Sequence, residues 1–172
     1  MKRIMEDFVG ALVCDHKNDR IPEEYNFFGK LVGVWDLDWN DHLHEAKKRR
    51  VKGEWIFSWV LEGMAIQDTF IVPSRVERLT DIQPDASYGT TIRIFNPSTL
   101  AWDIFWGEPG ESIRLEARKV DQEIVLTEIT QQSMKWIFSE ITDTSFVWKR
   151  IRRQEDGSWR LEVKALGTRK TV

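Results

Sequence analysis

The chain has 172 residues, of which 41% are hydrophobic and 12% aromatic, and this composition suits one domain with a substantial core. Its formal net charge of −3 argues against a general nucleic-acid binder, because phosphate contacts require an excess of basic side chains. Glu6 and Asp7 stand where an export signal needs an unbroken apolar stretch, and no later apolar run approaches the length of a membrane span. We therefore expect a cytoplasmic protein that binds neither nucleic acid nor membranes.

Several local features have a simple structural interpretation beside a functional one. Cys14 is the single cysteine, so it cannot close an intrachain disulfide and is expected to be a passive thiol. His42 and His44 have strand spacing but no evident third ligand, so we expect no metal site, with a two-histidine site as the alternative. The basic runs 47–50 and 149–153 are expected to be solvated surface rather than a nucleic-acid site. The chain has no glycine-rich phosphate loop and no nucleophile elbow.

The first part of the chain has helical features. Pro22 followed by Glu23 and Glu24 is typical of a helix start. Apolar residues recur earlier at helical spacing, namely Met5, Phe8, Val9 and Leu12. The sequence therefore predicts two short helices within residues 1–32, followed by a barrel over residues 33–172, all in a single domain.

Residues 52–72 form a predicted hairpin around which the sheet is organised. Trp55, Phe57 and Trp59 recur at every second position, which is the period of a strand. If Glu62 and Gly63 form a two-residue turn, Trp59 lies opposite Ile66 and Phe57 lies opposite Asp68. This register predicts that Asp68, rather than Gln67, lies on the aromatic face.

Alternating strands also begin near Trp35 and recur from Thr90 to the end of the chain, separated by short turns. Asn96-Pro97-Ser98 signals a turn, and a three-residue loop there that pairs Ile94 with Trp102 would place Thr90 opposite Trp106 and leave Arg93 outside, opposite Asp103. The registers set by the turns place all nine tryptophans on one face, at positions 35, 39, 55, 59, 102, 106, 136, 148 and 159. We therefore predict an all-β fold, an antiparallel up-and-down closed β-barrel of about ten strands with the tryptophans inside.

The segment Phe27–Trp35, with a short helix running into Gly33-Val34-Trp35, resembles the opening of lipocalin-like barrels of the calycin superfamily. The resemblance covers residues 22–172 and is closest to small, uncharacterised bacterial lipocalin-like families. It implies a barrel with a helix near one end and an internal cavity for a small, usually apolar molecule. Haem-binding relatives ligate iron through a histidine late in the barrel, and this chain has none after His44, so we expect no cofactor.

The inward tryptophans have two interpretations. They either fill the barrel as an ordinary core or line a cavity, because a barrel of about ten strands is wider than side chains alone fill. In the second interpretation, the expected ligand-binding residues are Trp35, Trp55, Trp59, Asp68, Thr90, Trp106, Glu128, Trp136, Trp148 and Arg150.

The polar members of this set, Asp68, Thr90, Glu128 and Arg150, need partners among indoles. They could form an internal network, with a Glu128–Arg150 pair laid across Trp136, or Arg150 could bind an anionic group of a ligand. Burial also raises the pKa of a carboxyl, so Asp68 or Glu128 could be a catalytic acid or base. We expect a protein that binds a small apolar or aromatic molecule with a polar end. The alternative is an isomerase, dehydratase or hydrolase that uses one of these carboxylates.

An apolar patch is predicted on the outer face of the barrel, where a monomer should be polar. Such a patch is either covered within the chain or forms an interface. The candidates are the N-terminal helix from Met5 to Cys14 and a second copy in a homodimer. The patch consists of Val125, Ile129, Ile137, Val147 and Ile151.

Overall fold

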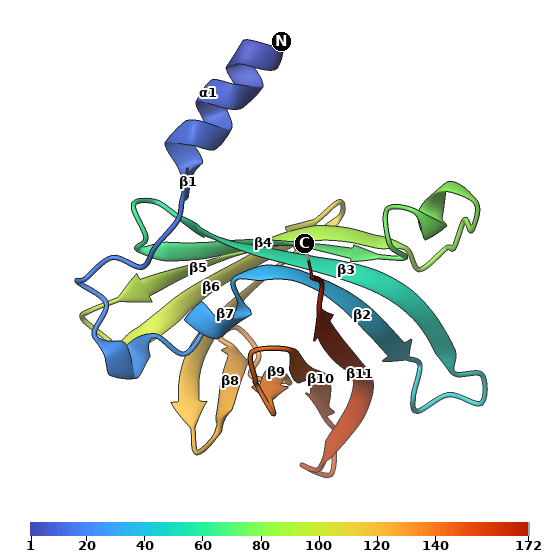
Figure 1. Ribbon diagram of the computed structural model, residues 1–172. Helices are drawn as coiled ribbons and strands as arrows, with labels where there is room; N and C mark the ends of the chain where they lie inside the picture. The colour runs from blue at the N-terminus through green and yellow to red at the C-terminus, as the bar shows by residue number, and fades with distance from the viewer. Residues whose placement is uncertain (172) are drawn as a thin grey trace.

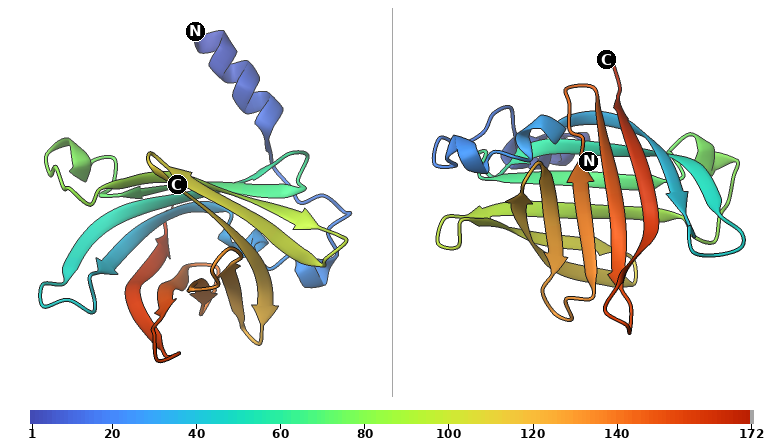
Figure 2. Two further views of the ribbon diagram at one scale, coloured as in Figure 1. Left: turned by 180° about the vertical axis from the view of Figure 1, so that it is seen from behind. Right: turned by 90° about the horizontal axis from the view of Figure 1, so that it is seen from below.

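The computed structural model describes residues 1–171 and confirms the predicted all-β barrel. Ten antiparallel strands follow one another around the barrel, and the last pairs with the first to close it (Figures 1 and 2). The strands are β2 (Gly33–Asp41), β3 (Arg49–Val60), β4 (Ala65–Val72), β5 (Ser87–Asn96), β6 (Ala101–Glu108), β7 (Glu111–Val120), β8 (Glu123–Glu128), β9 (Met134–Ser139), β10 (Ser145–Arg153) and β11 (Trp159–Arg169). The remaining elements are α1 (Lys2–Leu12), β1 (Val13–Cys14) and the 3₁₀ turns η1 (Glu23–Tyr25), η2 (Gly29–Leu31) and η3 (Glu77–Leu79).

One end of the barrel is closed by the segment that precedes β2. Ile21, Phe28 and Leu31 of this segment are fully buried. The indole N–H of Trp35 donates to the Leu31 carbonyl at 2.7 Å, and that of Trp102 donates to the Tyr25 carbonyl at 2.9 Å. The backbone of the segment makes i→i−3 hydrogen bonds, from the Tyr25 N–H to the Pro22 carbonyl and from the Leu31 N–H to the Phe28 carbonyl, which close 3₁₀ turns and not an α-helix. The predicted second helix is therefore wrong, and its place is taken by the two short turns η1 and η2.

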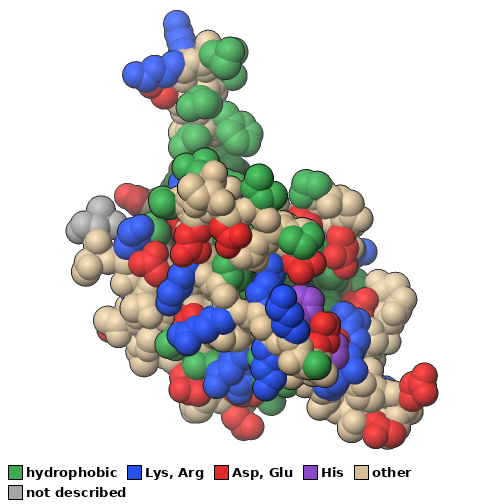
Figure 3. Space-filling model, turned by 90° about the vertical axis from the view of Figure 1, so that its right-hand side faces the viewer, with side chains coloured by type: hydrophobic (Ala, Val, Ile, Leu, Met, Phe, Trp, Pro, Cys, Tyr) green, Lys and Arg blue, Asp and Glu red, His purple; other side chains and the backbone are tan. Residues whose placement is uncertain are grey.

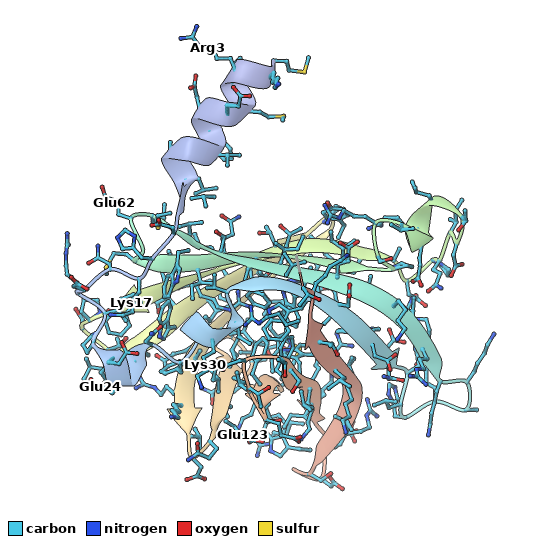
Figure 4. The ribbon with its side chains drawn as sticks, viewed as in Figure 1. Arg3, Lys17, Glu24, Lys30, Glu62 and Glu123 are labelled. Carbon is cyan, nitrogen blue, oxygen red and sulfur yellow. The ribbon has the colours of Figure 1, made fainter. Side chains whose placement is uncertain are left out.

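The polar side of the closing segment faces solvent at this end of the barrel. Figure 4 shows Glu24 and Lys30 there, with Lys17 on the strap that leads from α1. The Lys17 ammonium donates to the Ile21 carbonyl at 2.7 Å. The segment therefore has one apolar side that seals the barrel and one charged side in water.

The first predicted helix forms as α1, but it stands away from the barrel (Figure 1). None of its residues is buried. The helix therefore does not cover the outer apolar patch, and that predicted alternative is wrong. The chain returns to the barrel at β1, where Val13 pairs with Val60 of β3. No helix within residues 1–171 has the length and apolar character needed to cross a membrane.

The β3–β4 hairpin has the predicted register. Trp59 pairs with Ile66, and Phe57 pairs with Asp68. Leu61, Glu62 and Gly63 have φ values of 53°, 56° and 76°, and of these residues only the glycine adopts such a conformation without a steric cost. Asp68 therefore lies on the inner face, where it is 1% exposed.

The predictions for Thr90 and Arg93 in strand β5 are wrong. Asn96 pairs with Ala101, so the loop between β5 and β6 has one residue more than predicted, and the inner face of β5 shifts by one position. Thr91 lies opposite Trp106 on the inner face, whereas Thr90 is exposed on the outside. Arg93 lies inside and is 1% exposed, so the predicted Arg93–Asp103 pair is wrong.

Strand β11 contains a β-bulge, so the predicted inward face of Trp159 and Leu161 is wrong. Arg150 pairs with Val163 but Ile151 pairs with Leu161, so Glu162 is an extra residue without a partner in the ladder. The bulge turns Glu162 inward, where it is 6% exposed, and turns Trp159 outward, where it is 39% exposed. Trp159 is therefore the tryptophan that departs from the predicted inner face.

Candidate functional site

A cavity of about 650 Å³ occupies the barrel toward the end opposite the closing segment. Its lining reaches His42 in the β2–β3 loop, Pro84 and Asp85 in the β4–β5 loop, and Gln131 in the β8–β9 loop. Figure 3 faces this end of the molecule, where basic, acidic and histidine side chains lie close together. The barrel therefore has a filled end and a hollow end with a charged rim.

Indoles form much of the cavity wall. The rings of Trp39 and Trp148 stack, with centroids 5.3 Å apart, and the ring of Trp136 lies 5.8 Å from both Trp148 and Trp106. Trp55 and Phe70 complete this aromatic lining. Such a wall offers flat π-surfaces to a planar guest.

Two indole nitrogens of this wall, those of Trp136 and Trp148, have no hydrogen-bond partner among the described residues. An indole N–H can only donate, and burying it without a partner costs free energy. The aromatic wall is thus short of hydrogen-bond acceptors. By contrast, the Trp39 N–H donates to the Asp41 carboxylate at 2.8 Å.

The bulged residue Glu162 forms ion pairs with three arginines at the rim. Its carboxylate lies 3.2 Å from Arg150 Nε, 2.9 Å from Arg152 Nε and 3.2 Å from Arg160 Nη2. Burial alone would raise the pKa of Glu162, but the hydrogen bond from Arg152 and the charge of Arg150 lower it below its ordinary value. Burial lowers the pKa of Arg150, against the effect of Glu162. Three guanidinium groups thus share the Glu162 carboxylate, and the carboxylates of Asp41 and Glu111 also act on Arg150.

A second ion-paired network joins two rim loops. Arg49 Nη2 lies 2.5 Å from Asp41 Oδ2, and Arg49 Nη1 donates to Gln83 Oε1 at 2.8 Å. His42 Nδ1 lies 2.8 Å from Glu45 Oε1, and this hydrogen bond raises the pKa of His42. Within residues 1–171, no group of three or more histidine, cysteine or acidic side chains is arranged to hold a metal ion.

Acidic side chains belong to the same cavity lining as the arginines. Glu108, Glu111 and Glu128 line the cavity, and the Glu128 carboxylate accepts a hydrogen bond from the Ser133 hydroxyl at 3.0 Å. The predicted Glu128–Arg150 pair is wrong, because the bulge places Glu162 within reach of Arg150 instead.

Asp68 lies inside the barrel but outside the cavity lining. Its Oδ2 is 2.5 Å from Arg93 Nη1, and its Oδ1 accepts from the Thr91 N–H at 3.1 Å. The Arg93 guanidinium also lies over the rings of Phe28 and Phe57, at 5.3 Å and 5.1 Å. Burial raises the pKa of Asp68, and Arg93 opposes this effect. The pair belongs to the packed part of the core, where a ligand in the cavity does not reach it.

The structure thus divides the predicted site residues into two groups. Six of them line the cavity: Trp55, Trp106, Glu128, Trp136, Trp148 and Arg150. Trp35 and Trp59 are buried in the packed core, Asp68 is sealed beside Arg93, and Thr90 faces outward.

Sequence reasoning missed most of the other lining residues, and Arg152, Thr91, Trp39 and Phe70 show why. Arg152 continues the alternation of Trp148 and Arg150, so the strand period could have identified it. Thr91 was missed because the predicted loop between β5 and β6 was one residue too short. Trp39 and Phe70 were placed on the inner face, but alternation does not show how far along the barrel the hollow part extends.

No protein-family model matches the chain. No curated protein matches it either. Among solved structures, the barrel is similar to the S-type phycobiliprotein lyase CPES from Guillardia theta, with a TM-score of 0.60 and 12% sequence identity over 90% of this chain and 99% of that chain. At this identity the similarity concerns the fold. It supports the predicted ten-stranded barrel.

Proposed function

We propose that this protein binds a small aromatic or conjugated molecule with an acidic polar end inside its barrel. The observation that carries the proposal is the cavity of about 650 Å³, which has an indole wall and arginines at its rim. This volume is in the range of known small-molecule pockets, about 300–1,000 Å³. A core that was only structural would leave no such space, because protein interiors are close-packed.

The chemistry of the lining selects the ligand class. Flat indole faces favour a planar guest. Arg150 and Arg152 can pair with a carboxylate through charge-assisted hydrogen bonds. The similarity in fold to a phycobiliprotein lyase makes a bilin the first ligand to test.

The test uses tryptophan emission, because the indoles lie in the cavity wall. Biliverdin, an open-chain tetrapyrrole with two carboxylates, should quench the emission saturably. Its dimethyl ester should bind at least about ten-fold more weakly, because it cannot accept charge-assisted hydrogen bonds worth about 1.5–3 kcal/mol each. The double variant Arg150→Gln/Arg152→Gln should bind the acid and the ester with similar affinity.

Two tryptophan variants locate the ligand. A second, smaller aromatic acid, 2-naphthoate, serves as another probe. Trp136→Phe removes an indole of the cavity wall and should weaken the binding of biliverdin and of 2-naphthoate. Trp59→Phe removes a buried indole outside the cavity lining and should leave both affinities unchanged. Failure of both probes to quench saturably, or equal effects of the two variants, would contradict the proposal.

The second candidate is an enzyme that uses the same cavity, of isomerase, dehydratase or hydrolase type. Glu128 supports it, because this carboxylate lines the cavity and takes part in none of the ion pairs among the described residues. A carboxylate in that position could move a proton to or from a bound ligand. Glu128→Gln should then abolish turnover while leaving the ligand affinity within about two-fold. In a binding protein the same change should only alter affinity.

A further inference from the structure

We propose that α1 is a dimerisation arm that packs against a second copy of this chain. The helix has an apolar stripe on one side, formed by residues that are 52–73% exposed: Ile4, Met5, Phe8 and Val9. Figure 3 shows this hydrophobic side extending down the helix toward the barrel. At the base of the helix, Val13 and Leu61 are 42% and 43% exposed and extend the stripe. We call these six residues the arm surface.

The helix needs a partner because of its size. It has 11 residues, and isolated helices shorter than about 12–15 residues are marginal in water. Within residues 1–171, α1 buries none of its side chains, so its own barrel supplies no stabilising contact for the stripe. The strap after α1 is nevertheless anchored, since the Leu61 N–H donates to the Leu12 carbonyl at 3.1 Å. This anchor holds the arm at a defined place while its apolar side remains open.

The charges of the arm favour a second copy over an anionic surface. Lys2 and Arg3 are balanced by Glu6 and Asp7, so the polar residues of the helix have no net charge. Helices that lie on membranes usually have an excess of lysine and arginine on their polar side. A neutral polar side instead lets each arm pack along the barrel of a second copy without carrying a net charge of its own into the contact.

The area of the arm is also sufficient for a dimer. A helix of this length that packs along one side buries roughly 300 Å² on each of the two surfaces in contact. With each arm packed along the partner's barrel, the two-fold axis creates two such contacts with four surfaces in all, and the dimer buries about 1,200 Å², the lower limit of stable interfaces. In the outer patch predicted from the sequence, Ile129 is 42% exposed but Val147 is only 7% exposed, whereas all six residues of the arm surface are at least 42% exposed. The proposal does not depend on what the cavity binds.

Light scattering after size exclusion, over about 10 to 200 µM protein, tests the assembly. The wild type should be a dimer that dissociates on dilution, and Phe8→Asp should be a monomer. Two matched controls should remain dimeric: Glu6→Gln on the polar side of α1 and Ile137→Lys on the outer patch. The emission spectrum of Phe8→Asp should equal that of the wild type, because Phe8 is 66% exposed and contacts no core.

Hydrogen exchange supplies a readout within the arm itself. Amides of residues 2–12 should be protected at high protein concentration and exchange rapidly on dilution or in Phe8→Asp, whereas amides of the barrel should not change. A wild type that is monomeric throughout, a Phe8→Asp dimer of unchanged affinity, or loss of the dimer in Ile137→Lys would overturn the proposal. Sedimentation of a monomeric wild type with vesicles of phosphatidylcholine and phosphatidylglycerol would overturn it in favour of a membrane surface.

Discussion

Arg93 of β5 and Asp68 of β4 form an ion pair inside the barrel, with Nη1 and Oδ2 2.5 Å apart and both residues 1% exposed. Removing one member of such a pair leaves an uncompensated buried charge. Asp68→Asn should therefore lower the free energy of unfolding by about 3–5 kcal/mol, measured by urea denaturation. The double variant Asp68→Leu/Arg93→Met removes both charges and should recover most of the loss. A single variant as stable as the wild type would contradict this interpretation.

The Asp41–Arg49 pair predicts a specific pH dependence of stability. Burial raises the pKa of Asp41, but the hydrogen bonds from Arg49 and Trp39 lower it. The net effect holds the pKa of Asp41 below its ordinary value of 3.8. A carboxyl with a depressed pKa stabilises the fold above its unfolded pKa and loses this effect as the pH falls through its folded pKa.

The wild type should therefore exceed Asp41→Asn in unfolding free energy by about 1.5–3 kcal/mol at pH 7. The difference should stay constant down to about pH 5 and shrink below about pH 4. Thermal or urea unfolding of both proteins from pH 2 to pH 7 measures it. A difference that grows as the pH falls would have the wrong sign for this pair.

Trp159 predicts a mixed fluorescence spectrum. Most indoles are buried, and their emission should be blue-shifted, but Trp159 is 39% exposed and lies under the Lys135 ammonium, 4.7 Å from its ring centroid. Trp159→Phe should remove the red edge of the emission and most of the iodide-accessible fraction. Trp59→Phe, at a residue 6% exposed, is the matched control and should leave that fraction unchanged. Equal iodide quenching of the two variants would argue against the bulge in β11.

Gly167 predicts a packing constraint at the closed end. A Cβ at this position would lie 2.4 Å from ring atoms of Phe146, which is itself fully buried against Trp35. Gly167→Ala should therefore lower the unfolding free energy by about 1–3 kcal/mol. Gly10→Ala in α1 is the control, because a Cβ there meets no atom within 4 Å, and it should not destabilise the protein. Chemical denaturation of both variants compares them, and similar stabilities would refute the constraint.

The alternating pattern of the sequence determined the closed barrel and the face of most strands. It succeeded where the turn was defined by local chemistry. Glu62-Gly63 has a short turn with positive φ, so the parity of Asp68 followed from the chain alone. The turn at Asp121 and Gln122 likewise placed Glu128 on the inner face, because Val120 pairs with Glu123.

Tertiary structure decided the features that one extra residue can reverse. The additional residue in the β5–β6 loop exchanged Thr90 for Thr91 and brought Arg93 to Asp68. The bulge at Glu162 reversed the first part of β11 and created the arginine cluster, although local alternation there is unbroken. Alternation also could not show which indoles line a cavity, because this depends on Phe28 and Leu31 filling one end of the barrel. Alternation along a strand predicts the face on which a side chain lies. Loop lengths, bulges and a distant closing segment decide which residues that side chain contacts.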